Sequence, residues 1–292
     1  EYDCAFFDKR SKFLHYHPFV QILNNLEFDH ADIFNSLDDI KKQFHHLVRT
    51  VPGNGTIVMP YAYPALEDVL KMGVWTPVKR IGGKDGLHAK LIKQDGSVFA
   101  VYNGAEFICE VNAQFCGEYN VSNALMAAAA AAVVGVDLKK ALLSLETYKM
   151  PKRRMEYKGC EGNVVVYDDF AHHPTAIKLT LNGLRAKVGK GKRIVAVFEP
   201  RSNSMKMGAN KEFLAESFAS ADEAFIYAPK EVVWDVESLE EKSPTPLHVE
   251  HDFDVLLNKI VSASPAGSTV LVMSNGGFNG IHQKLLALLK SR

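Results

Sequence analysis

The sequence predicts an α/β protein with a mainly parallel sheet in its C-terminal half. Short, continuously apolar runs alternate there with helix-like segments, and polar or glycine-rich loops follow three of the four runs. A continuous apolar run is typical of a strand that is buried on both faces of a parallel sheet. The expected strands are Val164–Tyr167, Arg193–Phe198, Ala224–Tyr227 and Thr269–Met273, and the expected helices are Pro174–Val188, Asn210–Ser220, Phe253–Ala263 and Ile281–Lys290.

The N-terminal half mixes strands, helices and loops. An apolar run, Phe19–Leu23, is the first expected strand, and Thr56–Met59 is the next. Between them we expect a helix that ends near Arg49, because Ser36 is a favoured N-cap residue and Asp39 follows it by three positions.

Turn signals organise the rest of this half. Asp95–Gly96 and Asn103–Gly104 predict turns between β-rich pieces, so we expect an antiparallel meander over residues 89–115. Gly117 then precedes an alanine-rich helix, which Gly135 ends.

The length of 292 residues allows two domains, each large enough to bury a core. Tyr148–Glu156, which combines Met150–Pro151 with the basic run Lys152–Arg154, is the best candidate for a linker. We therefore predict one domain over residues 1–151 and a second over residues 152–292.

Composition excludes several classes of function. Lysine plus arginine equals aspartate plus glutamate at 34 each, so bulk charge does not predict a nucleic-acid or membrane partner. The apolar run Ala124–Val134 is too short to span a bilayer. The cysteines are scattered without a C-x-x-C pair, which argues against a zinc cluster and predicts a cytoplasmic protein: Cys4, Cys109, Cys116 and Cys160.

The densest group of chemically useful side chains follows the first expected strand of the C-terminal half. Asp168, Asp169, His172 and His173 stand just before Pro174, which suits the first position of a helix. Open α/β sheets bind ligands at the carboxyl ends of their strands, and groups this close are expected to perturb one another's pKa values. A capped helix start with solvated side chains is the alternative.

A second polar group follows the first expected strand of the N-terminal half. Its oxygens could hold a hard divalent cation, and its histidine could be a ligand or a base. A polar loop that leads into a helix is equally compatible with this spacing. The residues are Asn25, Glu27, Asp29, His30 and Asp32.

Other segments are rich in hydrogen-bond donors. Asn120 and Asn123 stand one turn apart at an expected helix start, where they could read a base or serve as ordinary capping residues. Lys152–Arg154 could clamp a phosphate or be solvated. Arg201–Ser204 and Ser274–Gly280 suit carboxylate or phosphate groups, although either could be a simple turn.

A phosphate loop of the form G-x-x-x-x-G-K-[ST] does not occur in the sequence. Gly189–Lys192 is too short for one and stands between an expected helix and an expected strand. A chain that handles ATP with these residues would need its triphosphate held by another segment.

The ordered motifs of the chain resemble those of the Mur ligases, ATP-dependent enzymes that form amide bonds in peptidoglycan synthesis. The resemblance covers essentially the whole chain. It rests on Glu1-Tyr-Asp3, Asn25…Asp29-His-Ala-Asp32, Gly117…Asn120…Asn123, Arg154-Met-Glu156 and Asp168-Asp-Phe-Ala-His-His-Pro174.

The resemblance implies three domains, which bind a UDP-sugar, ATP and the incoming amine. The chain would then be a fragment that begins late in the central domain, with the UDP-sugar domain and the phosphate loop upstream of Glu1. The second domain, 152–292, would be Rossmann-like. Two departures are His45–His46, near a position where some members carry a lysine, and Tyr119, where relatives often carry histidine.

The resemblance also implies roles for individual residues. Glu1 and His30 are expected to bind Mg²⁺, and His30, Asp169 and His172 are the expected catalytic residues. For ATP, the residues implied are Asn120, Asn123, Arg154 and Asp169. Weaker candidates for holding the carboxylates of a peptide are Arg201, Asn203, Ser274 and Asn279.

Two branches of the family compete for the substrate. The segments 6–12, 24–32, 199–208 and 274–284 resemble members that join L-alanyl-γ-D-glutamyl-meso-diaminopimelate to UDP-N-acetylmuramate in peptidoglycan recycling. Asp168–Pro174 is closest to the branch that adds L-alanine instead. A non-catalytic module that binds a nucleotide or a protein is the alternative from another class.

Overall fold

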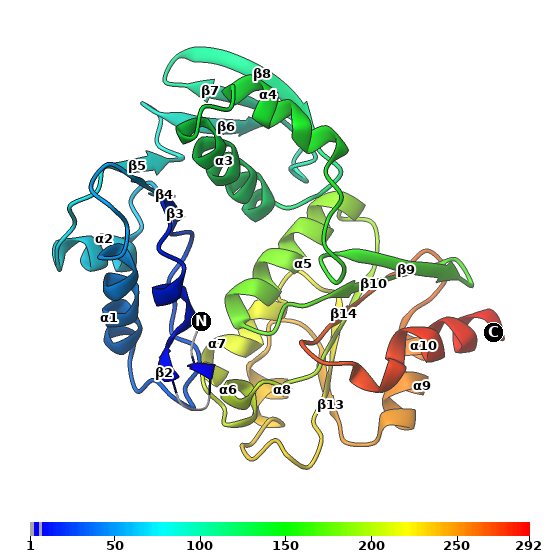
Figure 1. Ribbon diagram of the computed structural model, residues 1–292. Coiled ribbons are helices and arrows are strands. Elements are labelled where there is room, and N and C mark those ends of the chain that lie inside the picture. The colour runs from blue at the N-terminus through cyan, green and yellow to red at the C-terminus, as the bar shows by residue number, and fades with distance from the viewer. Residues whose placement is uncertain (1–2, 6–7) are drawn as a thin grey trace. The chain divides into compact units, whose positions relative to one another are not determined.

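The computed structural model describes residues 3–5 and 8–292 of the chain. They fall into two compact units, which are described separately below: unit 1 extends to Tyr148, and unit 2 covers Lys149–Arg292 (Figure 1).

Unit 1 contains a small parallel sheet with strand order β3-β4-β5. Its middle strand is apolar and buried at Ile57, Val58 and Met59, as the sequence predicts. Ser36 caps the first helix and accepts a hydrogen bond from Asp39 N, so this expectation is confirmed. The bounds are β3 Val20–Ile22, α1 Leu37–Val48, β4 Thr56–Pro60, α2 Pro64–Lys71 and β5 Val78–Ile81; the strands β1 Asp3–Ala5 and β2 Asp8–Ser11 and a 3₁₀ turn at Lys12–His15 precede them.

The expected antiparallel meander forms the second sheet of unit 1, with order β6-β7-β8. The alanine-rich helix α3 follows it, with Gly117 as N-cap at φ 94°, a backbone angle that favours glycine. A short helix α4 and a 3₁₀ turn complete the unit. The bounds are β6 Leu87–Leu91, β7 Val98–Asn103, β8 Glu106–Asn112, α3 Glu118–Val133, α4 Leu138–Leu143 and the 3₁₀ turn Ser144–Thr147.

Unit 2 is built on a six-stranded sheet with order β13-β12-β11-β14-β10-β9. Five strands are parallel, and β9 pairs antiparallel with β10 at one edge. The strands are β9 Glu156–Glu161, β10 Val164–Asp169, β11 Ile194–Phe198, β12 Glu223–Tyr227, β13 Leu247–Glu250 and β14 Thr269–Met273. All residues of β11 and β14 are buried, which explains their unbroken apolar sequences.

Helices cover both faces of this sheet (Figure 1). Side chains from α5, α7 and α8 enter the core on one face, and those from α9 and α10 enter the core on the other. The bounds are α5 Pro174–Val188, α6 Asn203–Lys206, α7 Lys211–Leu214, α8 Ser238–Lys242, α9 Phe253–Ala263 and α10 Ile281–Lys290, with 3₁₀ turns at Ala215–Phe218 and Phe278–Gly280. The prediction of an α/β fold with a mainly parallel sheet is confirmed.

Three details differ from the sequence-based expectation. Asp168 and Asp169 belong to β10 rather than to the loop after it, because their backbones continue the parallel register with Val272 and Met273. The helix expected over residues 210–220 is a short helix followed by a 3₁₀ turn. The strand β13 was not expected, because the polar residues within it weaken its apolar signal.

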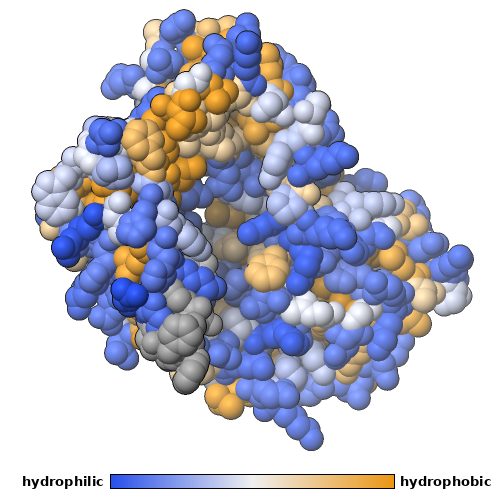
Figure 2. Space-filling view, viewed as in Figure 1, coloured by the Kyte–Doolittle hydropathy of each residue, from blue (hydrophilic) through white to orange (hydrophobic). Residues whose placement is uncertain are grey.

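The two units differ in the hydropathy of their visible surfaces. Hydrophobic surface gathers over the upper part of unit 1, whereas the visible surface of unit 2 is mainly hydrophilic (Figure 2). Within the described part of the chain, every helix is too short or too polar to cross a membrane.

Candidate active site

The carboxyl ends of the parallel strands in unit 2 gather polar residues at one edge of the sheet. Asp169 ends β10, Glu199 follows β11 directly, and Ser274 follows β14 directly. Backbone hydrogen bonds continue past the strands, from Ser274 N to Asp169 O and from Glu199 N to Met273 O. The sheet therefore brings together three segments that are distant in sequence.

Asp169 is almost completely buried, with 1% of its surface exposed. Its carboxylate accepts hydrogen bonds from Met155 N and Ala171 N, both at 2.8 Å. Burial raises the pKa of Asp169, and the two backbone donors oppose that rise. The Asp169 side chain thus links the turn before β9 to the end of β10, which is a structural role.

Asp168 lies beside it but has different partners. Arg153 Nε lies 3.4 Å from Asp168 Oδ2, and His282 Nε2 lies 3.3 Å from Asp168 Oδ1. Burial acts to raise the pKa of Asp168, but His282, Arg153 and Lys158 together hold that pKa below its usual value. Neighbouring carboxyl groups therefore have pKa values shifted in opposite directions.

The two arginines of the basic turn before β9 have different environments. The Arg153 side chain donates from Nη2 to Ser274 O and lies over the Phe170 ring, 5.0 Å from its centroid. The Arg154 side chain is exposed. Of these two arginines, Arg154 is therefore the more accessible to solvent.

The two histidines after β10 are also distinct. His173 caps α5, because Nδ1 accepts from Thr175 N, and its Nε2 lies 3.3 Å from Asn210 Nδ2. His172 Nδ1 lies 3.1 Å from its neighbour's carbonyl, Phe170 O. Donation from Nδ1 to that carbonyl leaves Nε2 of neutral His172 as a proton acceptor.

The loops after β11 and β14 lie against each other. A Cβ atom built on Gly276 would lie 1.9 Å from Arg201 Cδ, so the arginine lies directly on that glycine. Ser274 is 1% exposed, donates to Glu199 Oε2 at 2.6 Å and accepts from Gly276 N at 2.9 Å. Of the predicted peptide-binding residues, Arg201 is exposed and Ser274 is engaged inside the loop.

The other two predicted residues lie on the same loops. Asn203 is the first residue of α6, and its side chain is exposed. Asn279 is exposed in a left-handed turn at φ 49°. Phe278 anchors that turn, because its ring is 1% exposed and stacks on Tyr227 at 5.8 Å between centroids.

In unit 1 the two predicted amides hold the start of α3. Asn120 Nδ2 donates to Cys116 O at 2.7 Å, and Asn123 Oδ1 accepts from Asn24 Nδ2 at 2.6 Å. The second bond links α3 to the loop after β3, although the two residues are 99 positions apart. Sequence reasoning did not anticipate Asn24 as a partner.

The loop after β3 presents His30 from a left-handed backbone conformation, with φ 54°. Its N–H donates to Asp29 Oδ1 at 2.7 Å, and its carbonyl accepts from Ile33 N and Phe34 N. Glu1, the other expected Mg²⁺ ligand, lies outside the described residues. Within residues 3–5 and 8–292, no three His, Cys, Asp or Glu side chains form a group that could hold a metal ion.

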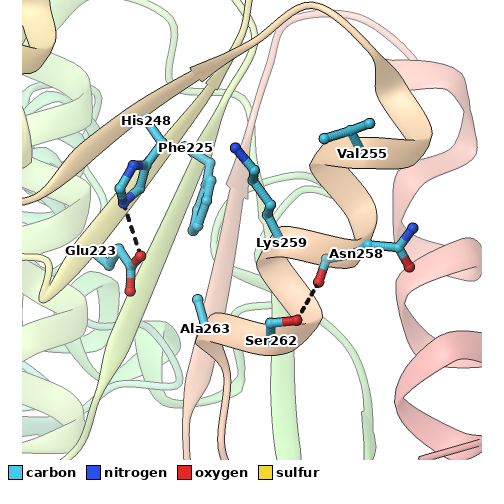
Figure 3. A pocket seen from close by; sticks show the side chains of 8 residues that line it. All are labelled: Glu223, Phe225, His248, Val255, Asn258, Lys259, Ser262 and Ala263. Atoms are coloured by element: carbon cyan, nitrogen blue, oxygen red, sulfur yellow. Dashed lines mark hydrogen bonds and ion pairs between the residues drawn. The ribbon is translucent and has the colours of Figure 1, made fainter.

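A separate hollow of about 450 Å³ lies at the opposite end of the unit 2 sheet (Figure 3). It is bordered by Glu223 at the start of β12, by His248 on β13 and by Lys259 on α9. His248 Nε2 lies 3.0 Å from Glu223 Oε1, and Lys259 pairs with Glu250. Because it lies at the amino ends of the strands, this hollow is distinct from the predicted site.

Sequence reasoning missed three residues of the carboxyl-edge cluster. Arg153 was considered only within Lys152–Arg154, which could clamp a phosphate or be solvated, and neither Glu199 nor His282 was expected as a site residue. Two signals pointed to them: Glu199 directly follows a fully apolar strand, and His282 stands in the first turn of the helix after the Ser274–Gly280 loop.

The fold and these strand-end clusters define an α/β protein whose two units each present polar residues at the carboxyl edge of a parallel sheet. Residues 6–131 match the Mur ligase middle domain, and residues 153–276 match the domain described as Mur ligase, glutamate ligase domain. The chain belongs to the Mur ligase family.

Particular relatives sharpen this assignment. The chain is 50% identical, over 98% of its length and 63% of the relative's, to the UDP-N-acetylmuramate–L-alanyl-γ-D-glutamyl-meso-2,6-diaminoheptandioate ligase of Escherichia coli (strain K12). A crystal structure of a murein peptide ligase from Psychrobacter arcticus matches with a TM-score of 0.73 and 44% identity, over 100% of this chain and 62% of that one.

A more distant relative represents the other branch. The chain is 30% identical to the UDP-N-acetylmuramate–L-alanine ligase of Caldanaerobacter subterraneus, over 97% of this chain and 63% of the relative. In each of these three comparisons the chain spans less than two thirds of the relative's length.

Proposed function

We propose that this chain forms the nucleotide-binding and amine-binding parts of an ATP-dependent ligase. The enzyme would join L-alanyl-γ-D-glutamyl-meso-diaminopimelate to UDP-N-acetylmuramate in peptidoglycan recycling. The identity of 50% to a relative with that name, against 30% to the alanine ligase, supports the tripeptide as substrate. The structural observation that carries the proposal is the contact of Arg201 with Gly276, which joins two donor-rich loops at one sheet edge.

In this proposal the first predicted domain, residues 1–151, which includes unit 1, carries the nucleotide site. The hydrogen bonds that hold Asn120 and Asn123 use one donor and one acceptor, respectively. The atoms outside these two bonds are the Asn120 carbonyl oxygen, an acceptor, and the Asn123 amide nitrogen, a donor. Adenine offers the complementary pair, an amino donor next to a ring-nitrogen acceptor.

Mg²⁺ fits the residues of unit 1 only with help from the substrate. The described residues hold His30 in a defined loop but supply no three-ligand cluster. Mg²⁺ usually keeps several waters and takes phosphate oxygens together with one or two protein ligands, so His30 and Glu1 would suffice. When bound, the ion would neutralise charge on the phosphates.

The second predicted domain, residues 152–292, which lies within unit 2, carries the amine site in this proposal. ATP phosphorylates the muramate carboxylate to an acyl phosphate, and the free amine of the tripeptide attacks the acyl carbon and displaces phosphate. In this proposal Nε2 of His172 accepts the amine proton, and Arg154 contacts the nucleotide. Arg201 would bind a peptide carboxylate through paired N–H donors, and Asp169 would position the Arg154 turn rather than touch the reactants.

The decisive experiment measures phosphate release with ATP, Mg²⁺, UDP-N-acetylmuramate and either the tripeptide or L-alanine. A full-length enzyme that carries this chain should use the tripeptide, whereas residues 1–292 alone should not turn over, because they contain no phosphate loop. Efficient use of free alanine with no use of the tripeptide would establish the other branch. Turnover by residues 1–292 alone would disprove the fragment hypothesis.

A further inference from the structure

A row of buried and half-buried polar groups lies within unit 2 and leads to the Ser274–Gly280 loop. It runs from His282 on α10 to Asp168 on β10, then to Arg153 in the turn before β9, and from Arg153 Nη2 to the carbonyl of Ser274. The side chain of His282 is 12% exposed and that of Asp168 is 6% exposed. Four segments of the fold therefore meet through three side chains.

The contact between His282 and Asp168 is the one in which hydrogen bonding is least complete. His282 Nε2 and Asp168 Oδ1 are 3.3 Å apart, but among the described residues neither atom has a hydrogen bond of good geometry. A buried carboxylate oxygen with neither an N–H donor nor a cation beside it carries a large desolvation cost. Asp168 therefore depends on His282 on one side and on Arg153 on the other.

Arg153 connects Asp168 to the Ser274–Gly280 loop. Its guanidinium lies between Asp168 and the Ser274 carbonyl, and the ring of Phe170 lies against it. The loop that starts at Ser274 contains Gly276, on which Arg201 lies. A change in the position of Arg153 would thus alter the support of the exposed Arg201 side chain.

We propose that His282 is a positioning residue: through Asp168 and Arg153 it holds the Ser274–Gly280 loop in the conformation that supports Arg201. The effect on substrate binding rests on the proposed function, whereas the effect on the loop does not. The role requires a hydrogen-bond donor at Nε2 and not only a side chain of similar volume.

Hydrogen exchange of the amides of residues 275–280, followed by mass spectrometry, tests the loop directly. His282→Leu fills the space but removes the donor, and its exchange should be faster by about tenfold, equivalent to about 1.4 kcal/mol. His282→Gln keeps an N–H donor at a similar reach and should stay within about twofold of the wild-type rate. Equal exchange in the leucine variant and the wild type would overturn the proposal, and so would equal exchange in the leucine and glutamine variants.

His248→Leu is the matched control, because it removes a histidine from a carboxylate, Glu223, at the other end of the same sheet (Figure 3). Its exchange at residues 275–280 should equal that of the wild type. An equal increase in this control would attribute the effect to general loss of stability and overturn the proposal.

The kinetic consequence is measured in the full-length enzyme. His282→Leu should raise the KM for the tripeptide about tenfold and leave the KM for ATP unchanged, and His282→Gln should restore the tripeptide KM. A lower kcat with an unchanged tripeptide KM would contradict the proposed link to Arg201. If the wild-type enzyme does not ligate the tripeptide, the proposed function fails while the exchange result still decides the role of His282.

Discussion

The two ends of the sheet in unit 2 use the same kinds of side chain to different effect. At the carboxyl end, the aspartate is buried, the histidine and the arginine are half-buried, and the group is connected to loops from three strands. At the amino end, Arg193 and His248 pair with Glu223 at the border of an open hollow, and the His248 side chain is 43% exposed. Exposed ion pairs contribute little to stability, whereas buried ones become costly when one partner is removed. The same pairing is therefore expected to support a site at one end and to have little effect at the other.

The largest expected effect separates the two adjacent histidines at the carboxyl end. In a full-length enzyme, His172→Ala should lower kcat by roughly 10²-fold, the scale for a positioned proton acceptor, with stability changed by less than about 1 kcal/mol. His173→Ala should instead lower the free energy of unfolding by about 1 kcal/mol, because it removes the cap of α5. Steady-state kinetics and urea unfolding measure the two effects, and a near-normal kcat for His172→Ala would leave this histidine without a catalytic role.

The second effect contrasts the stability of the two ends. Asp169→Asn places an amide donor against one of the two backbone N–H groups that the carboxylate accepts, and it should cost about 1–3 kcal/mol. Glu223→Gln at the amino end should cost less than about 1 kcal/mol, because its partners are partly exposed. Urea unfolding of both variants measures the difference. Equal losses would show that burial does not distinguish the two ends.

Two glycines of one loop test the placement of Arg201. Gly276→Ala should displace the arginine and raise the tripeptide KM about tenfold, as Arg201→Ala should, with the KM for ATP unchanged. Gly277→Ala is the control, because a Cβ there meets no atom within 4 Å and the backbone is right-handed at φ −80°. A change in tripeptide KM for Gly277→Ala but not for Gly276→Ala would refute this placement.

The smallest expected effect concerns the pH dependence of stability. The contributions of the neighbouring carboxyl groups of Asp168 and Asp169 should change with pH in opposite directions. Because the folded pKa of Asp169 is raised, its contribution to stability is greatest at low pH and falls as the pH rises above about 4. Because the folded pKa of Asp168 is lowered, its contribution is present above about pH 4 and is lost as the pH falls below that value. Subtracting the pH profiles of Asp168→Asn and Asp169→Asn from the wild-type profile isolates each contribution, and slopes of the same sign would contradict the two environments described here.

The sequence was most informative where one local signal dominated. Four elements of unit 2 have the predicted bounds, namely α5, α9, α10 and β14, because apolar periodicity and residues such as Pro174 and Asp252 act within a few positions. Ser36 and Gly117 likewise marked the start of their helices. The motif Asp168–Pro174 and the loop Ser274–Gly280 were located at strand ends for the same reason, since each directly follows an apolar run.

Partnerships between distant segments were decided only by the tertiary structure. The contacts of Arg153 with Ser274, of Asp168 with His282 and of Arg201 with Gly276 join positions about 75 to 121 residues apart. The Asn24–Asn123 bond does the same in unit 1. The sequence determined which side chains stand at the ends of the strands, because burial and periodicity are local properties. Strand order then selected which of those side chains become neighbours, and this selection distinguishes Asp168 from Asp169, Arg153 from Arg154 and His172 from His173.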